Sequence, residues 1–178
     1  MGAIPRRQKI LMLAVIIGGV IFLYCSAFEI VEKHRLAVAL IFYALIPPIW
    51  LQSDEMLLDL DKREVFLAWL FLAIIQFAFY LEWRTYPVYD IRNHEMPHTS
   101  INVMISGSTV GSMKALLVFL IFYFLFNKLN KRITGFPLVS TSRKSNWYSD
   151  EAKREITGYD VLFNILLLFI TGCACIFD

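Results

Sequence analysis

Residues 10–28 read ILMLAVIIGGVIFLYCSAF, a run of 19 residues without a charged side chain. An α-helix needs about 20 predominantly apolar residues to cross the hydrocarbon core of a bilayer. Two further runs, residues 65–81 and 161–177, each contain 17 residues without a charge. These three runs decide the fold class, because they predict an all-α, polytopic bundle of transmembrane helices.

The composition also indicates a membrane protein. Hydrophobic residues make up 58% of the 178-residue chain, against about 45–50% in an average soluble protein. The 17 basic and 15 acidic residues are clustered between the long apolar runs. This pattern excludes an ordinary soluble domain and an intrinsically disordered chain, and we expect no direct binding of nucleic acid.

Two less regular segments complete a bundle of five predicted spans. Residues 36–51 are uncharged and contain Pro47 and Pro48, so we expect a kinked helix that extends to Ser53. Another segment ends at Phe126, but Lys114 interrupts its apolar run and leaves its start open. The predicted spans of this single integral membrane domain are residues 10–28, 36–53, 65–81, 108–126 and 161–177.

The basic residues predict the orientation of these spans. With five spans and a cytoplasmic N-terminus, 12 of the 17 Lys and Arg residues lie on the cytoplasmic side, as the positive-inside rule requires. If residues 36–53 only dip into the membrane, four spans remain and 11 basic residues lie outside, which breaks the rule. We therefore expect five spans, in the inner membrane of a bacterium.

Residues 94–98 match the zinc-binding pattern H-E-x-x-H. In a zinc hydrolase, imidazoles such as those of His94 and His98 bind the metal, and a glutamate such as Glu95 acts as general base. Pro97 disfavours the helix that this geometry requires. We therefore expect a solvated loop with no cofactor and no stoichiometric metal. The alternatives are a loop that senses metal ions or protons, and a membrane metal hydrolase.

Small and polar residues near the fourth span predict close helix packing. Gly107 and Gly111 are four residues apart, so in a helix they would let another backbone approach closely. Gln76, Lys114 and Asn164 lie in or beside predicted spans, where a polar group is best satisfied against another helix. These features predict a homo-oligomer in which the fourth span packs near the symmetry axis.

Lys114 has two interpretations that depend on where its helix begins. If the span begins at Val110, the lysine lies about one turn inside and its ammonium can reach the outer interface. If the span begins near Ile101, Lys114 lies in mid-helix and needs a partner such as Gln76 or Asn164. The second case predicts a small channel or transporter with a polar cavity at Lys114.

The longest polar segment, residues 127–160, carries seven basic and four acidic residues. It is longer than a cytoplasmic loop needs to be to fix orientation, and its aromatic residues are of the kind enriched in protein interfaces. We therefore expect it to bind a cytoplasmic partner protein. An alternative is that it pairs with the acidic residues of segment 54–64. The candidate contact residues are Arg132, Arg143, Lys144, Trp147, Tyr148, Lys153 and Arg154.

Apart from residues 94–98, the sequence contains no motif that would support catalysis. The expected function is therefore that of a non-enzymatic membrane subunit, which anchors, senses or forms a pore within a larger assembly. Small polytopic proteins without catalytic motifs are frequent among bacterial toxin-immunity proteins and the membrane subunits of phage-defence systems. That expectation comes from architecture alone, because a fold does not specify a function.

Overall fold

A computed structural model of the protein describes residues 4–27, 33–85, 112–141, 148–149 and 154–176. This part of the chain is mostly helical, as predicted. The long helices are α1 (Arg6–Ala27), α2 (Lys33–Leu51), α4 (Arg63–Thr85), α7 (Ala115–Thr134) and α8 (Gly158–Ile176). The shorter elements are α3 (Asp54–Asp59), the 3-10 turn η1 (Ser112–Lys114), β1 (Tyr148–Ser149) and β2 (Arg154–Glu155).

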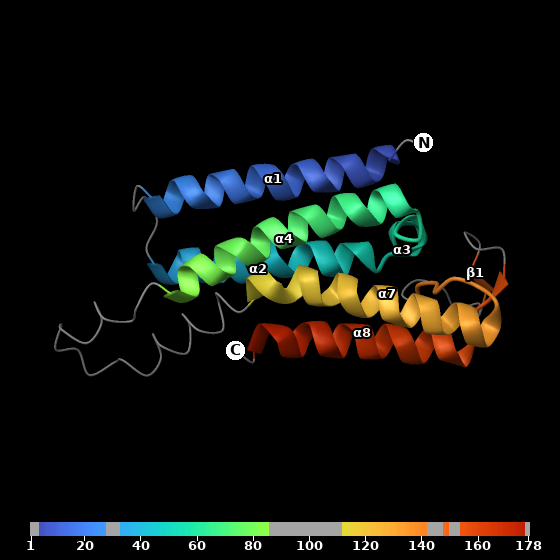
Figure 1. Cartoon of the computed structure of the whole chain (residues 1–178). Helices are drawn as coiled ribbons and strands as arrows, with labels where there is room; N and C mark the ends of the chain where they lie inside the picture. Colours follow the sequence, from blue (N-terminus) through green and yellow to red (C-terminus); the bar gives the residue numbers. More distant parts are fainter. Residues whose placement is uncertain (1–3, 28–32, 86–111, 142–147, 150–153, 177–178) are drawn as a thin grey trace.

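The long helices lie side by side, and consecutive ones run in opposite directions (Figure 1). Helix α1 packs on α2 and α4, these two pack on α7, and α7 packs on α8. One end of the bundle holds the N-terminus, α3 and the connection from α7 to α8, and we call it the charged end. Figure 1 shows α7 and α8 extending past α1 and α4 at this end.

Aromatic and aliphatic side chains form one continuous core between the helices. Trp69 of α4 and Phe119 and Tyr123 of α7 are fully buried in it. The rings of Phe126 and Phe163 stack with their centroids 5.1 Å apart and join α7 to α8. Packing is therefore continuous from α1 at one edge of the bundle to α8 at the other.

The outer surface of the long helices is unusually apolar. Large apolar side chains point outward from every one of them, for example Ile17, Phe42, Phe71, Phe124 and Phe169. A soluble monomer rarely exposes apolar surface of this extent. Within the described residues, two helical segments are long and apolar enough to cross a membrane, Ser112–Thr134 and Gly158–Cys175, and Val38–Leu51 is a shorter apolar helix.

Helix α7 ends later than the apolar run that predicts it. The sequence places the end of this segment at Phe126, but the helix continues to Thr134. Beyond Phe126 the helix is two-sided, because Asn127 and Asn130 are buried while Lys128 is exposed. Because a count of apolar residues does not detect such a helix, the sequence pattern assigns its last eight residues to the expected loop.

Candidate functional site at the charged end of the bundle

The carboxylate of Asp160 lies at the centre of a buried polar cluster where α8 begins. Arg154 donates to it from Nη1 and Nη2, over 2.9 and 2.8 Å. The backbone N–H and the hydroxyl of Thr157 donate to Asp160 Oδ2 over 2.9 and 2.7 Å. The side chains of Asp160 and Arg154 are only 0% and 9% exposed. A buried ion pair of this kind needs such additional hydrogen bonds to offset the loss of water.

The sequence forms this cluster locally. The N–H of Asp160 donates to the Thr157 hydroxyl over 3.3 Å while its carboxylate accepts from Thr157, a reciprocal capping box at the start of α8. Arg154 is held in place by β2, because Ser149 of β1 pairs with it in the antiparallel ladder. The short strands β1 and β2 therefore place the guanidinium of Arg154 against the carboxylate of Asp160.

The same cluster binds the chain that follows α7. Gly135 ends that helix in the left-handed conformation, with φ of 80°. The chain then turns back, and Asn127 Oδ1 accepts from the N–H of Leu138 over 2.8 Å. Asn164 Nδ2 donates to the carbonyl of Val139 over 2.7 Å. Arg154 Nη2 donates to the carbonyl of Pro137 over 2.9 Å. Side chains of α7, β2 and α8 therefore fix residues 137–139 through their backbone groups.

A second set of polar contacts connects this region to α3 and α4. Asp61 accepts from Asn127 Nδ2 over 2.8 Å and from Lys131 Nζ over 2.5 Å. The contact with Lys131 is one ion pair between the acidic 54–64 segment and the basic residues after position 126, of the kind that the alternative interpretation of the loop expects. The hydroxyl of Tyr123 donates to the carbonyl of Leu57 over 3.0 Å.

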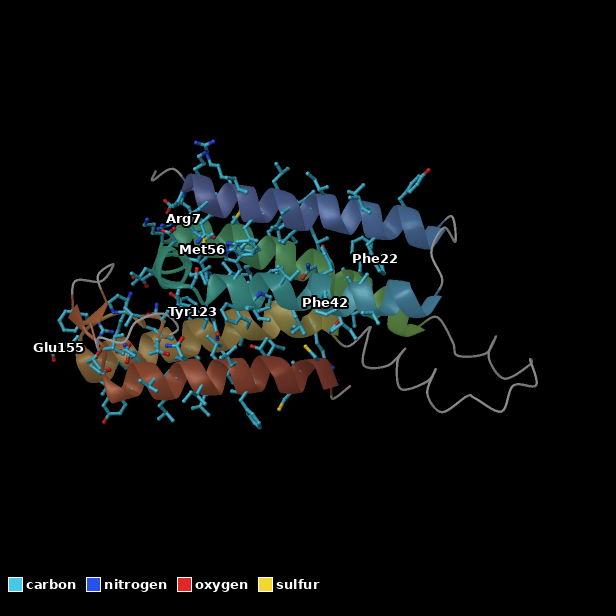
Figure 2. All side chains as sticks on the ribbon, turned by 180° about the vertical axis from the view of Figure 1, so that it is seen from behind. Arg7, Phe22, Phe42, Met56, Tyr123 and Glu155 are labelled. Atoms are coloured by element: carbon cyan, nitrogen blue, oxygen red, sulfur yellow. The ribbon has the colours of Figure 1, made fainter. Side chains whose placement is uncertain are left out.

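Helix α1 is tied to the charged end as well. Figure 2 shows Arg7, Met56 and Tyr123 near this end. Arg7 Nε and Lys62 Nζ donate to the carboxylate of Asp59 over 2.9 and 2.7 Å. Burial raises the pKa of the Asp59 carboxyl, but the hydrogen bonds and charges of Lys62 and Arg7 outweigh it, so the pKa lies below its ordinary value of 3.8. These two contacts therefore stabilise the fold at neutral pH. The stabilisation is lost as the pH falls below 3.8 and through the lower pKa of Asp59 in the folded state.

The carboxylates at this end of the bundle are committed to contacts within the chain. Asp59, Asp61 and Asp160 are each paired with a cationic side chain. The described part of the chain contains no group of three or more His, Cys, Asp or Glu residues that could hold a metal ion. Together these polar contacts form one network at the charged end, which we call the platform.

An open groove of about 670 Å³ lies on the outer side of this platform. Three large apolar side chains in it are exposed, those of Phe136, Tyr159 and Leu162. The guanidinium of Arg154 lies 5.5 Å from the centre of the Phe136 ring and supports it from the protein side. We call this the end groove, and it is lined by Thr134, Phe136, Arg154, Glu155, Thr157, Gly158, Tyr159 and Leu162.

Many residues proposed from the sequence lie outside the described residues. These are the metal candidates His94, Glu95 and His98, the small residues Gly107 and Gly111, and the loop residues Arg143, Lys144, Trp147 and Lys153. The expected solvated loop without stoichiometric metal, its metal-binding alternatives and the homo-oligomer therefore stay untested. Tyr148 is placed by its backbone in β1, and Arg132 is exposed on α7. Arg154 differs from the expected surface contact, because it is buried against Asp160.

Two of the three polar residues proposed for a cavity lie at opposite ends of the bundle. Asn164 belongs to the charged end, where it bonds the carbonyls of Val139 and Asp160. Lys114 lies in η1 at the opposite end, near Cys175. Gln76 lines a cavity between α1, α2 and α4 that Met113, the residue before Lys114, also lines. The structure therefore gives no support to a polar cavity shared by Lys114 and Asn164.

Comparison with known proteins gives no independent guide to function. No protein-family model matches the chain, and searches of curated proteins and of solved structures find no significant similarity. The functional interpretation therefore depends on the geometry of the chain itself.

Proposed function

We propose that the protein is a non-enzymatic, multi-pass subunit of a larger assembly in a bacterial inner membrane, and that it binds a cytoplasmic protein through its charged end. The observation that carries this proposal is the end groove. It combines exposed apolar side chains with a backbone that buried hydrogen bonds hold in place. An interface of this kind binds with little loss of conformational entropy.

The apolar exterior supports five membrane spans. Helices α1 and α2 carry apolar side chains around the whole helix instead of on one face, which is typical of membrane spans and of fully buried helices. In this bundle they are not fully buried, since Ile17 and Phe42 point outward. The long helices have 19 to 23 residues, or about 28–35 Å at 1.5 Å per residue, enough to cross the hydrocarbon core.

The arrangement of the helices supports a cytoplasmic charged end. The N-terminus, the α3 region and the α7–α8 connection all lie at this end (Figure 1). Residues 1–9, 52–64 and 127–160, which comprise these segments and the end of α7, contain 12 of the 17 Lys and Arg residues of the chain. Positive residues of short loops are retained on the cytoplasmic side, so the end groove faces the cytoplasm.

Partner binding is assigned to the groove and not to the basic side chains alone. Arg154 and Lys131 are committed to Asp160 and Asp61 within the chain, so they are not free to bind another protein. Phe136 and Tyr159 remain exposed, and aromatic residues are enriched at the centres of interfaces. The biological process, for which the architecture favours phage defence or toxin immunity, stays a prediction.

Site-specific photo-cross-linking in cells tests this proposal. The photoreactive amino acid benzoylphenylalanine would replace Phe136 in the end groove, and Phe124, which is exposed on α7 outside this groove, would serve as the matched control. Their side chains are 53% and 54% exposed, so they differ in location and not in accessibility. We expect a discrete adduct with one other protein from position 136 and none from position 124.

Two outcomes would contradict the proposal. One is an absence of protein adducts at position 136 when the variant is inserted and folded. The other is the same set of adducts from both positions, which would indicate non-specific contact along the whole helix. A single adduct at twice the mass of the chain would assign the groove to self-association and would also overturn a cytoplasmic partner.

A further inference from the structure

A cavity of about 250 Å³ lies between α1, α2 and α4, away from the charged end. Phe22, which lines it, is labelled toward the opposite end in Figure 2. The other walls are mainly aliphatic and aromatic side chains, among them Val15, Leu72 and Phe79. In the proposed function this cavity has no role.

The polar side chains in this lining are Tyr43 and Gln76. Gln76 is only 4% exposed, and neither its Oε1 nor its Nε2 has a hydrogen-bond partner in the described structure. Tyr43 lies beside it, and its oxygen can accept from Gln76 Nε2, but its O–H donates to the carbonyl of Val15 over 3.0 Å and so is not available to Gln76 Oε1. A buried amide oxygen without a donor is costly, so the site lacks at least a group that donates to Gln76 Oε1.

Water alone does not fill the cavity. A buried water molecule is held by two to four polar partners, and the polar side-chain atoms of the described lining are confined to Tyr43 and Gln76, enough to hold water in one corner of a volume of about 250 Å³. An occupant that is mostly apolar and carries one polar group matches this lining better.

The cavity opens toward the apolar exterior. Ile16 and Val20 of α1 and Ile75 of α4 line it and are also exposed on the outer surface. On the membrane location of the proposed function, this opening faces lipid. An occupant would therefore enter from the bilayer and would be a lipid-soluble molecule.

The geometry points to a binding site for a protonated fatty acid, with the chain in the cavity and the carboxyl group on Gln76. A neutral carboxyl donates its O–H to Gln76 Oε1 and accepts from Nε2, so one group satisfies both atoms. The described residues of the lining include no Lys or Arg to hold an ionised carboxylate, and an apolar environment favours the neutral form. An ester has no O–H to donate to Oε1, and an alcohol has only a single oxygen with which to reach both amide atoms.

Photolabelling of the full-length protein in lipid nanodiscs tests the site. The nanodiscs contain phosphatidylcholine and phosphatidylglycerol, and the probe is dodecanoic acid with a diazirine in mid-chain. We expect saturable labelling of α1 and α4 that dodecanoic acid competes and its methyl ester does not. Gln76→Leu should reduce labelling about tenfold, because the complex loses two hydrogen bonds.

A matched pair of variants on α1 controls for general effects. Val20→Trp fills the mouth of the cavity, whereas Ile21→Trp makes the same change at a neighbouring exposed position that does not line it. We expect labelling to fall about tenfold with the first change and to be unaffected by the second. If Gln76→Leu does not fold, the comparison of Val20→Trp with Ile21→Trp tests the binding site by itself.

Several results would overturn the site. They are non-saturable labelling, equal competition by the methyl ester, and equal labelling of Val20→Trp and Ile21→Trp. The thermal stability of Gln76→Leu without ligand is a further check, because removing an unpaired amide should leave the Tm unchanged or raise it. A lower Tm would assign Gln76 to packing and would also overturn the proposal. Failure of the cross-link at Phe136 does not affect these readouts, because Phe136 is not part of this cavity.

Discussion

Asp160→Ala is expected to destabilise the folded protein by about 3–5 kcal/mol, the usual cost of removing one partner of a buried ion pair. The change leaves the guanidinium of Arg154 buried without its counter-charge. It also removes the acceptor for the N–H and hydroxyl of Thr157, and buried donors without acceptors add to the cost. Thermal unfolding of the purified protein in mild detergent measures the effect.

Lys131→Gln provides the control at the same end of the bundle. It removes the partner of Asp61, but the two side chains are 43% and 32% exposed. Solvent screens such a pair, so we expect a loss of about 1 kcal/mol or less. Equal losses of stability for Lys131→Gln and Asp160→Ala would contradict the expectation that the buried ion pair contributes more to stability than the exposed one.

Trp69→Ala is expected to cost about 3–5 kcal/mol through the cavity it creates in the core. Trp69 is fully buried, and its Nε1 donates to Gln8 Oε1 over 2.7 Å. Gln8 Nε2 in turn donates to the carbonyl of Met56 over 3.1 Å. One indole therefore fixes the start of α1 against α3 and α4. Denaturation of the variant, followed by far-UV circular dichroism, measures the loss.

Two further variants separate the ring of Trp69 from its N–H. Trp69→Phe keeps most of the packing but leaves Gln8 Oε1 without its donor, so about 1–3 kcal/mol should be lost. Phe71→Ala removes a ring from the same helix at a position that is 64% exposed, where about 0.5 kcal/mol or less is expected. A loss of stability for Phe71→Ala as large as that for Trp69→Ala would contradict the conclusion that Trp69 lies on the buried face of α4 and Phe71 on its outer face.

Sequence patterns were sufficient for the features that depend on local composition. Long uncharged runs predicted the helices, because a run such as residues 10–28 can satisfy its backbone in apolar surroundings only as a helix. The opposite charges of segments 54–64 and 127–160 indicated contact between them as an alternative to partner binding, and the structure contains one such contact, between Asp61 and Lys131. Gln76 was singled out because it is polar within an apolar run.

The polar cluster could not be predicted from charge counts. Arg154 was grouped with the exposed basic residues, because its burial depends on Asp160 and on a chain turn that closes only in the fold. One local signal was present, since Thr157 and Asp160 have the spacing of a capping box just before an apolar run. Asn127 gave no comparable signal, and Asn164 was singled out only as a polar residue within a span, because the backbone groups of Leu138 and Val139 that they bond are brought to them by the fold.

Labelling of single cysteines from the two sides of the membrane tests the central claim, five spans with the charged end in the cytoplasm. In a variant without Cys25, Cys173 and Cys175, the changes Thr99→Cys and Ser142→Cys place one thiol in each of the two longest polar segments. With an impermeant thiol reagent on intact cells, we predict labelling of position 99 from outside and labelling of position 142 only after the membrane is opened. Labelling of both positions from the same side would contradict the five-span bundle.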